Sequence, residues 1–258
     1  MPAFAANLSF MFQELPFLDR FDAAAEARFV AVEYLFPYEH PPEAIAERLE
    51  RTGLTQALFN LPPGDWAAGE RGLAALPARF DEVKAGVETA LPYIAATGVK
   101  RVHMMAGLAD PGSAAANAAY RRSIAHVAGR LAELDVEVML EPINGRDMPG
   151  YFLGDLDVAA ALIAELGLPN VKLQFDIYHC QIIHGDVTMR LRRHLPITGH
   201  VQIASVPSRN EPDGEELNYP FLFQQLDLLG YEGFVGCEYR PRGKTVEGLD
   251  WMTDAGAR

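Results

Sequence analysis

The sequence predicts an α/β fold, a single (β/α)8 TIM barrel over residues 1–258. Three observations favour this fold. The length of 258 residues suits one such domain, strand-like and helix-like segments alternate along the chain, and oxygen-bearing side chains end the later strands. No linker or change in composition marks a second domain. A doubly wound open sheet is the structural alternative, but it would usually carry a glycine-rich phosphate turn after its first strand, where this sequence has none.

Eight apolar segments predict the strands of this barrel. In chain order they are FAANLSF (4–10), FVAVEYLF (29–36), QALFNLP (56–62), KRVHMMAG (100–107), VEVMLEPIN (136–144), VKLQFDIYH (171–179), GHVQIAS (199–205) and FVGCEY (234–239). The fifth shows the pattern most clearly, because its apolar run ends at a carboxylate, Glu141. Pro142 follows and has no amide hydrogen to donate to a neighbouring strand. We therefore expect buried strands that present polar side chains at their carboxyl ends.

Helix-like segments separate these strands. They span 18–29, 43–53, 78–97, 114–134, 156–167, 186–195 and 220–230, and a further helix ends the chain. Gly53 and Gly98 predict C-terminal stops, Asp155 predicts an N-cap, and Pro220 predicts a first helical turn. The longest connections follow the third, fifth and seventh strands. Because their carboxyl ends share one mouth of the barrel, we expect the functional site there.

Composition and charge narrow the classes of function. The formal net charge of −13 argues against a nucleic-acid partner, because phosphate binding needs a basic surface. No apolar run approaches the roughly 18 residues that a membrane span needs, and we expect no signal peptide. Two distant cysteines, Cys180 and Cys237, are typical of a reduced, cytoplasmic protein. The acidic surface permits a homo-oligomer without predicting one.

Four oxygen-bearing side chains fall on the last four predicted strands: Glu141, Asp176, Gln202 and Glu238. Neighbouring strands lie about 5 Å apart, so these side chains can converge on one ion. An all-oxygen set favours Mg²⁺ or Mn²⁺ over zinc, which prefers nitrogen and sulfur ligands. The alternative is that two of the four cap loops or pair with arginines.

His179, Arg71 and Arg209 are the candidate substrate-binding residues. His179 lies three residues beyond Asp176, where it can contact a substrate hydroxyl or a metal ligand, or be a hydrogen-bonded histidine in a packed loop. His103, inside the fourth strand, is expected to be structural or to line the barrel. Three carboxylates and one divalent cation leave a charge near −1, so a small anionic hydroxy or oxo acid would need local cations. The two loop arginines suit a carboxylate through the planar guanidinium, although solvent exposure is the default for such residues.

Several motifs spread along the chain carry a family resemblance. They are ANLSFMF (6–12), VEYLFPY (32–38), NLPPGDWAAGERG (60–72), EPINGRDMPGYFL (141–153), QFDIYH (174–179), GHVQIA (199–204), RNEP (209–212) and EYRP (238–241). With them the sequence resembles the hydroxypyruvate isomerase family, within the xylose-isomerase-like barrel superfamily, over essentially its whole length. Two departures lie in the loop after the seventh strand. The chain reads EPDGEELNY where the family often has glycine and threonine before Glu-Ile-Asn-Tyr, and Ser208 where the family commonly has histidine.

The resemblance implies an isomerase that uses a divalent metal and no organic cofactor. It implies metal ligands at Glu141, Asp176, Gln202 and Glu238, with Glu141 and Glu238 as the paired acid/base carboxylates. The reaction would interconvert hydroxypyruvate and tartronate semialdehyde through an enediolate, a step of glyoxylate and carbohydrate-acid metabolism. His179 would orient a substrate oxygen, and Arg71 or Arg209 would hold the substrate carboxylate.

Three other functions stay open. A 2-oxo-tetronate isomerase would keep the same catalytic residues and act on a four-carbon acid. An abasic-site endonuclease uses the same barrel, but that chemistry usually needs a histidine-rich zinc site and a basic face, which the charge of −13 disfavours. A non-catalytic sugar-acid binding protein would give no reason for Glu141 and Glu238 to reach one metal.

Overall fold

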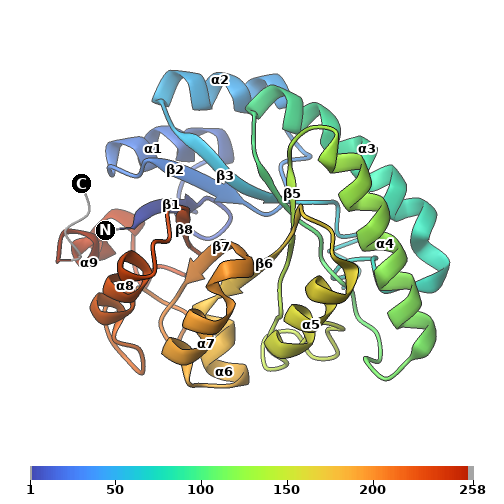
Figure 1. Ribbon diagram of the computed structural model, residues 1–258. Helices are drawn as coiled ribbons and strands as arrows, with labels where there is room; N and C mark the ends of the chain where they lie inside the picture. The colour runs from blue at the N-terminus through green and yellow to red at the C-terminus, as the bar shows by residue number, and fades with distance from the viewer. Residues whose placement is uncertain (1, 255–258) are drawn as a thin grey trace.

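The computed structural model describes residues 2–254 and shows a closed barrel of eight parallel strands (Figure 1). Each strand pairs with the next along the chain, and the last pairs with the first. The strands are β1 (Ala3–Asn7), β2 (Ala31–Tyr34), β3 (Thr55–Asn60), β4 (Arg101–His103), β5 (Glu137–Leu140), β6 (Val171–Asp176), β7 (Thr198–Ile203) and β8 (Phe234–Cys237). The predicted (β/α)8 fold class is confirmed.

Helices surround the strands on the outside of the barrel (Figure 1). They are α1 (Arg20–Glu26), α2 (Pro42–Thr52), α3 (Phe80–Thr97), α4 (Ala114–Ala132), α5 (Leu156–Leu166), α6 (Ile177–Ile183), α7 (Val187–His194), α8 (Tyr219–Leu228) and α9 (Asp250–Asp254). Short 3-10 turns are η1 (Phe17–Asp19), η2 (Pro77–Arg79), η3 (Leu195–Ile197) and η4 (Thr245–Gly248). Among the described residues, no helix combines the length and the apolar character that crossing a bilayer would require.

The helix ends follow the signals in the sequence. Gly53 and Gly98 adopt the left-handed conformation just after α2 and α3 and donate their amides to the last turn. The Asp155 carboxylate accepts hydrogen bonds from two backbone amides at the start of α5. Pro220 lies in the first turn of α8, where its missing amide hydrogen costs nothing. These four predictions are confirmed.

The sixth strand ends earlier than its sequence indicated. The apolar run of 171–179 predicted a strand through His179, but β6 ends at Asp176 and α6 begins at Ile177. The Asp176 carboxylate accepts hydrogen bonds from the amides of Tyr178, at 2.7 Å, and His179, at 3.4 Å. This capping starts a helix directly at the strand end. His179 therefore lies on the first helical turn, beside the carboxylate that precedes it.

The interior of the barrel is polar, unlike the apolar layer between strands and helices. Asn7, Glu33, Gln174, His200 and Gln202 come from four strands, and all are buried. Hydrogen bonds join these side chains across the barrel, including strands that are not neighbours. This polar floor lies directly beneath the carboxyl ends of β6, β7 and β8, where the candidate site is built.

Candidate active site

A cavity of about 230 Å³ opens at the carboxyl end of the barrel. Five of the seven predicted site residues line it: Arg71, Glu141, His179, Arg209 and Glu238. The other two, Asp176 and Gln202, contact these residues from below. The tertiary structure thus brings together side chains that are spread over more than half of the sequence.

Glu141, Asp176 and His179 form a buried cluster. One possible ligand atom from each lies within 4.8 Å of the others. Glu141 Oε1 and Asp176 Oδ2 have no hydrogen-bond partner within the described part of the chain. A buried carboxylate oxygen without a partner costs free energy, and a divalent cation between the two would remove that cost. The donor set therefore fits a hard cation.

Burial strongly perturbs the site carboxylates. It raises the pKa of Asp176 to about 6 and the pKa of Glu238 to about 8, although the Arg209 guanidinium works in the opposite direction for both. Burial, and then the charge of Glu238, raises the pKa of Glu141 well above its usual range. Three desolvated carboxyl groups in one place resist simultaneous ionisation, as clustered like charges do. A bound cation would favour the ionised forms.

His179 is held as a hydrogen-bond donor toward this cluster. Its Nδ1 accepts the backbone amide of Asn144, at 3.4 Å, and lies 2.6 Å from the Asn144 side-chain nitrogen. Burial lowers the pKa of His179 well below its usual value, so the ring is neutral. A neutral ring that accepts at Nδ1 carries its proton on Nε2. Nε2 lies 3.6 Å from Asp176 Oδ2 and 3.8 Å from Glu141 Oε1, so it can donate to an oxygen placed between them.

Glu238 is held on both carboxylate oxygens. Oε1 accepts a hydrogen bond from Arg209 Nη2 at 2.6 Å. Oε2 accepts from the amides of Gln202, at 2.6 Å, and Asn7, at 3.2 Å. This arrangement fixes the carboxylate plane at the edge of the cavity, with the oxygen that faces Arg209 on the cavity side.

The Gln202 amide presents its nitrogen to Glu238 rather than its oxygen. Its Nε2 lies between Glu238 Oε2 and Glu33 Oε1, and its Oε1 accepts from Gln174 at 2.6 Å. Because the two facing carboxylates accept hydrogen bonds, the amide nitrogen belongs between them. A direct metal ligand at Gln202 would need its amide oxygen turned toward the cluster. The ligand role of this residue stays a prediction.

Arg209 and Arg71 differ in how deeply their side chains are buried. Arg209 is nearly buried, pairs with Glu238 and Asp147, and stacks on the Tyr178 ring with its central carbon 4.8 Å from the ring centre. Arg71 lies at the rim, where its guanidinium stacks on Trp66 at 3.9 Å and donates to two backbone carbonyls. No carboxylate pairs with Arg71 among the described residues. Its charge is therefore available to an anion that enters the cavity.

Three residues outside the predicted site set also lie at the site. His103, expected to be structural or to line the barrel, lines the cavity, with Nδ1 3.6 Å from Glu141 Oε2. Asp147 accepts hydrogen bonds from Arg209 and Tyr178, and Asn144 orients His179. For His103, its position in the last residue of β4 was the available signal. The other two lie in a loop, without a comparable pattern.

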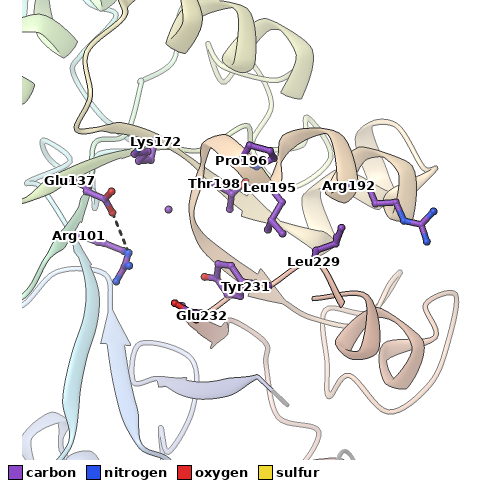
Figure 2. Close-up of a pocket in the computed structure, with 13 residues that line it drawn as sticks. Arg101, Glu137, Lys172, Arg192, Leu195, Pro196, Thr198, Leu229, Tyr231 and Glu232 are labelled. Atoms are coloured by element: carbon purple, nitrogen blue, oxygen red, sulfur yellow. Dashed lines mark ion pairs between the residues drawn. The ribbon is translucent and has the colours of Figure 1, made fainter. Parts of the chain in front are cut away.

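A second and larger opening, of about 490 Å³, lies at the opposite end of the barrel (Figure 2). Its walls come from the first residues of several strands, among them Arg101, Glu137 and Lys172. Figure 2 shows Arg101 and Glu137 directed at each other, and their ion pair spans 3.5 Å. This cavity contains none of the predicted site residues.

Known proteins resemble this chain over nearly its whole length. The 2-oxo-tetronate isomerase of Cupriavidus necator is 55% identical over 254 residues, which cover 98% of each chain. The hydroxypyruvate isomerase of Escherichia coli is 41% identical with the same coverage. A crystal structure described as an AP endonuclease, family 2, from Brucella melitensis superposes with a TM-score of 0.96, at 48% identity, over 98% of this chain and 99% of that one.

The family comparison covers most of the sequence. Residues 21–255 match the family described as xylose isomerase-like TIM barrel. This range contains all seven predicted site residues, from Arg71 to Glu238, and seven of the eight strands of the barrel. The chain belongs to the xylose isomerase-like TIM barrel family.

Proposed function

We propose that this chain is a metal-assisted isomerase of a short hydroxy-oxo acid, interconverting hydroxypyruvate and tartronate semialdehyde in the cytoplasm. The observation that carries the proposal is the pair Glu141 and Glu238. Both are buried, both line one cavity, and burial raises the pKa of each carboxyl. Carboxyl groups whose pKa is raised by burial bind protons more readily than ordinary carboxyls and are suited to transfer them in both directions. The names of the relatives support an isomerase.

Glu141 and Asp176 would hold the cation, with Glu238 and Gln202 completing the predicted set. Glu141 and Asp176 are favoured as ligands because each has a buried carboxylate oxygen without a hydrogen-bond partner in the described part of the chain. When bound, Mg²⁺ or Mn²⁺ would act as a Lewis acid that stabilises negative charge on the substrate oxygens.

The side chains would then carry out a proton transfer between adjacent carbons. One glutamate removes a proton from the carbon that bears the hydroxyl group, which gives an enediolate. The same glutamate or its partner returns a proton to the former carbonyl carbon, while the hydroxyl proton moves to the oxygen there. The Nε2 proton of His179 is placed to donate to a substrate oxygen. Arg209 and Arg71 would hold the substrate carboxylate.

A second candidate substrate is a four-carbon 2-oxo-tetronate. The 55% identity to a protein named 2-oxo-tetronate isomerase favours it, against 41% to one named hydroxypyruvate isomerase. The site supports both, because the catalytic residues act on the carbons next to the carboxylate and only the length of the substrate differs.

The test is a coupled assay of protein stripped of metal and reloaded with Mg²⁺ or Mn²⁺. Hydroxypyruvate and the four-carbon acid are offered side by side, with Glu238→Gln as the control. We expect cation-dependent turnover that the control lacks. Turnover of the four-carbon acid alone would keep the mechanism and change the substrate. Absence of turnover of both acids, with cation bound, would exclude the proposed function.

The same protein preparation tests two alternative functions, an abasic-site endonuclease and a non-catalytic sugar-acid binding protein. The cluster of possible ligands among the described residues contains one histidine, whereas the endonuclease chemistry calls for a histidine-rich zinc site. Cleavage of a duplex that contains an abasic site would favour the endonuclease. Binding of the acid without turnover, unchanged in the Glu141→Gln and Glu238→Gln variants, would favour the binding protein.

A further inference from the structure

A buried carboxylate beneath the site has no role in the proposed chemistry. Glu33, on β2, is fully buried and reaches across the barrel interior. Its Oε1 accepts hydrogen bonds from the side-chain amides of Asn7, at 3.0 Å, and Gln202, at 2.8 Å. Its Oε2 lies 2.6 Å from His200 Nε2. These groups satisfy a charge that would otherwise be costly at this depth.

The two amides that contact Glu33 also contact Glu238. Each offers one hydrogen to Glu33 Oε1 and one to Glu238 Oε2, the latter over 3.2 Å from Asn7 and 2.6 Å from Gln202. An amide held between two acceptors has a fixed orientation, because turning it over would place its oxygen against a carboxylate. The position of Glu238 Oε2 therefore depends on where the Glu33 carboxylate lies.

The backbone makes room for this carboxylate. Gly236, on β8, lies under Glu33, and a Cβ atom at that position would be only 2.3–2.5 Å from the three carboxylate atoms. The backbone of Gly236 does not have a positive φ, so the glycine is explained by space and not by conformation. Glu33 and Gly236 lie 203 residues apart in the sequence, on strands separated by β1. The missing side chain of the glycine thus leaves the space that the carboxylate occupies.

We propose that Glu33 is a positioning residue for Glu238. Through the amides of Asn7 and Gln202 it fixes Oε2 of that carboxylate and thereby directs Oε1 toward Arg209 and the cavity. His200 holds Glu33 from the other side, and Gly236 supplies the space. The inference rests on the proposed function only in giving Glu238 an acid/base role. The hydrogen bonds of the Asn7 and Gln202 amides to Glu33 and Glu238 do not depend on that role.

The first experiment measures kcat, KM and Mn²⁺ affinity for the Glu33→Gln variant. A glutamine keeps the volume but replaces one acceptor oxygen with an NH2 donor. That donor must face either the amides of Asn7 and Gln202 or His200 Nε2, so these groups cannot all keep their present donor roles. We expect kcat to fall about 10–100-fold, as is typical when a residue that supports a catalytic or metal-binding group is lost, with KM changed less than about threefold. The matched control is Gln56→Met. Gln56 is a buried amide of β3 without a hydrogen-bond partner among the described residues, and this change should leave kcat unaltered.

A double-mutant cycle separates positioning from a simple charge effect. Mn²⁺ affinity, measured by calorimetry, should weaken in Glu33→Gln when Glu238 is present and change less than about twofold in a Glu238→Gln background. Equal weakening in both backgrounds would show that Glu33 acts only through its charge, which overturns the proposal. This readout needs no turnover, so it remains decisive if neither acid is a substrate.

Gly236→Ala provides a second, independent variant that keeps the charge. The added methyl group must displace the Glu33 carboxylate, so kcat should fall as in Glu33→Gln. In a Glu33→Ala background the same change meets no carboxylate and should leave the melting temperature unaltered. A Gly236→Ala enzyme with wild-type kcat would contradict the positioning role.

Discussion

The two ends of the barrel hold cavities of different size and different chemistry. The opening at the amino ends of the strands measures about 490 Å³, and the one at the carboxyl ends about 230 Å³. The larger cavity contains charges that are paired with each other near solvent, such as Arg101 and Glu137, whose side chains are 25% and 32% exposed. The smaller cavity is lined by the buried carboxylates Glu141 and Glu238, and Asp176 lies directly below it. Glu141 Oε1 and Asp176 Oδ2 have no hydrogen-bond partner among the described residues.

Under the proposed function the smaller cavity is the active site, so volume is a poor guide to function in this protein. A paired, partly exposed charge is nearly neutral for stability, whereas a buried and unsatisfied one is retained at a cost. Such a cost is typical of sites that bind or transform a ligand. The comparison predicts that equivalent substitutions at the two ends will have very different effects.

The largest expected effect is the loss of a proton-transfer group. Glu238→Gln removes the titratable carboxyl but keeps its size, so kcat should fall about 10²–10⁴-fold. The matched change at the other end, Glu137→Gln, should leave kcat within about twofold. Steady-state kinetics of both variants tests the comparison. Comparable losses of kcat in the two variants would contradict the predicted difference between the two ends of the barrel.

Cation binding should depend on pH at the carboxyl end. The pKa of Asp176 is raised to about 6 and that of Glu238 to about 8, so both bind protons more readily than ordinary carboxyls in the metal-free protein. A cation must displace those protons, and its affinity should therefore rise with pH between 6 and 8, by up to about tenfold per unit for each proton released. Calorimetry in buffers of different ionisation enthalpy measures both affinity and proton release. Affinity that is flat over this range would contradict the prediction.

Substrate affinity should depend on the planar shape of the buried Arg209 guanidinium as well as on its charge. Arg209→Lys keeps the charge but loses the planar fork that contacts Glu238 and Asp147. Charged hydrogen bonds of this kind contribute about 1.5–3 kcal/mol, so kcat/KM should fall about 10–100-fold. Arg192→Lys, at the opposite cavity, is the control and should behave as wild type. An Arg209→Lys enzyme with unchanged kcat/KM would remove the carboxylate-binding role.

The smallest effect should come from breaking the ion pair at the amino end. Arg101→Gln removes a partly exposed pair, which contributes about 0–1 kcal/mol to the free energy of unfolding. Denaturant unfolding should therefore show a small loss of stability, with kcat unaltered. A loss of several kcal/mol, or of activity, would mean that this end of the molecule has a function of its own.

The sequence by itself determined the fold and the end of the barrel where the candidate site lies. Alternating strand and helix patterns specify a barrel, and the direction of the chain in a parallel barrel fixes which end carries residues such as Glu141 and Glu238. Helix boundaries marked by Gly53, Gly98 and Asp155 were equally predictable, because glycine and aspartate act on their immediate neighbours.

Only the tertiary structure decided how the polar atoms are oriented. The Nε2 proton of His179, the amide orientation of Gln202 and the depth of Arg209 all depend on partners from other strands and loops. Glu33 is the clearest case, since its contact with His200 joins residues 167 positions apart. Local patterns predict elements because backbone geometry repeats over a few residues. Hydrogen bonds across a barrel interior have no such period, so their partners appear only once the strands are assembled.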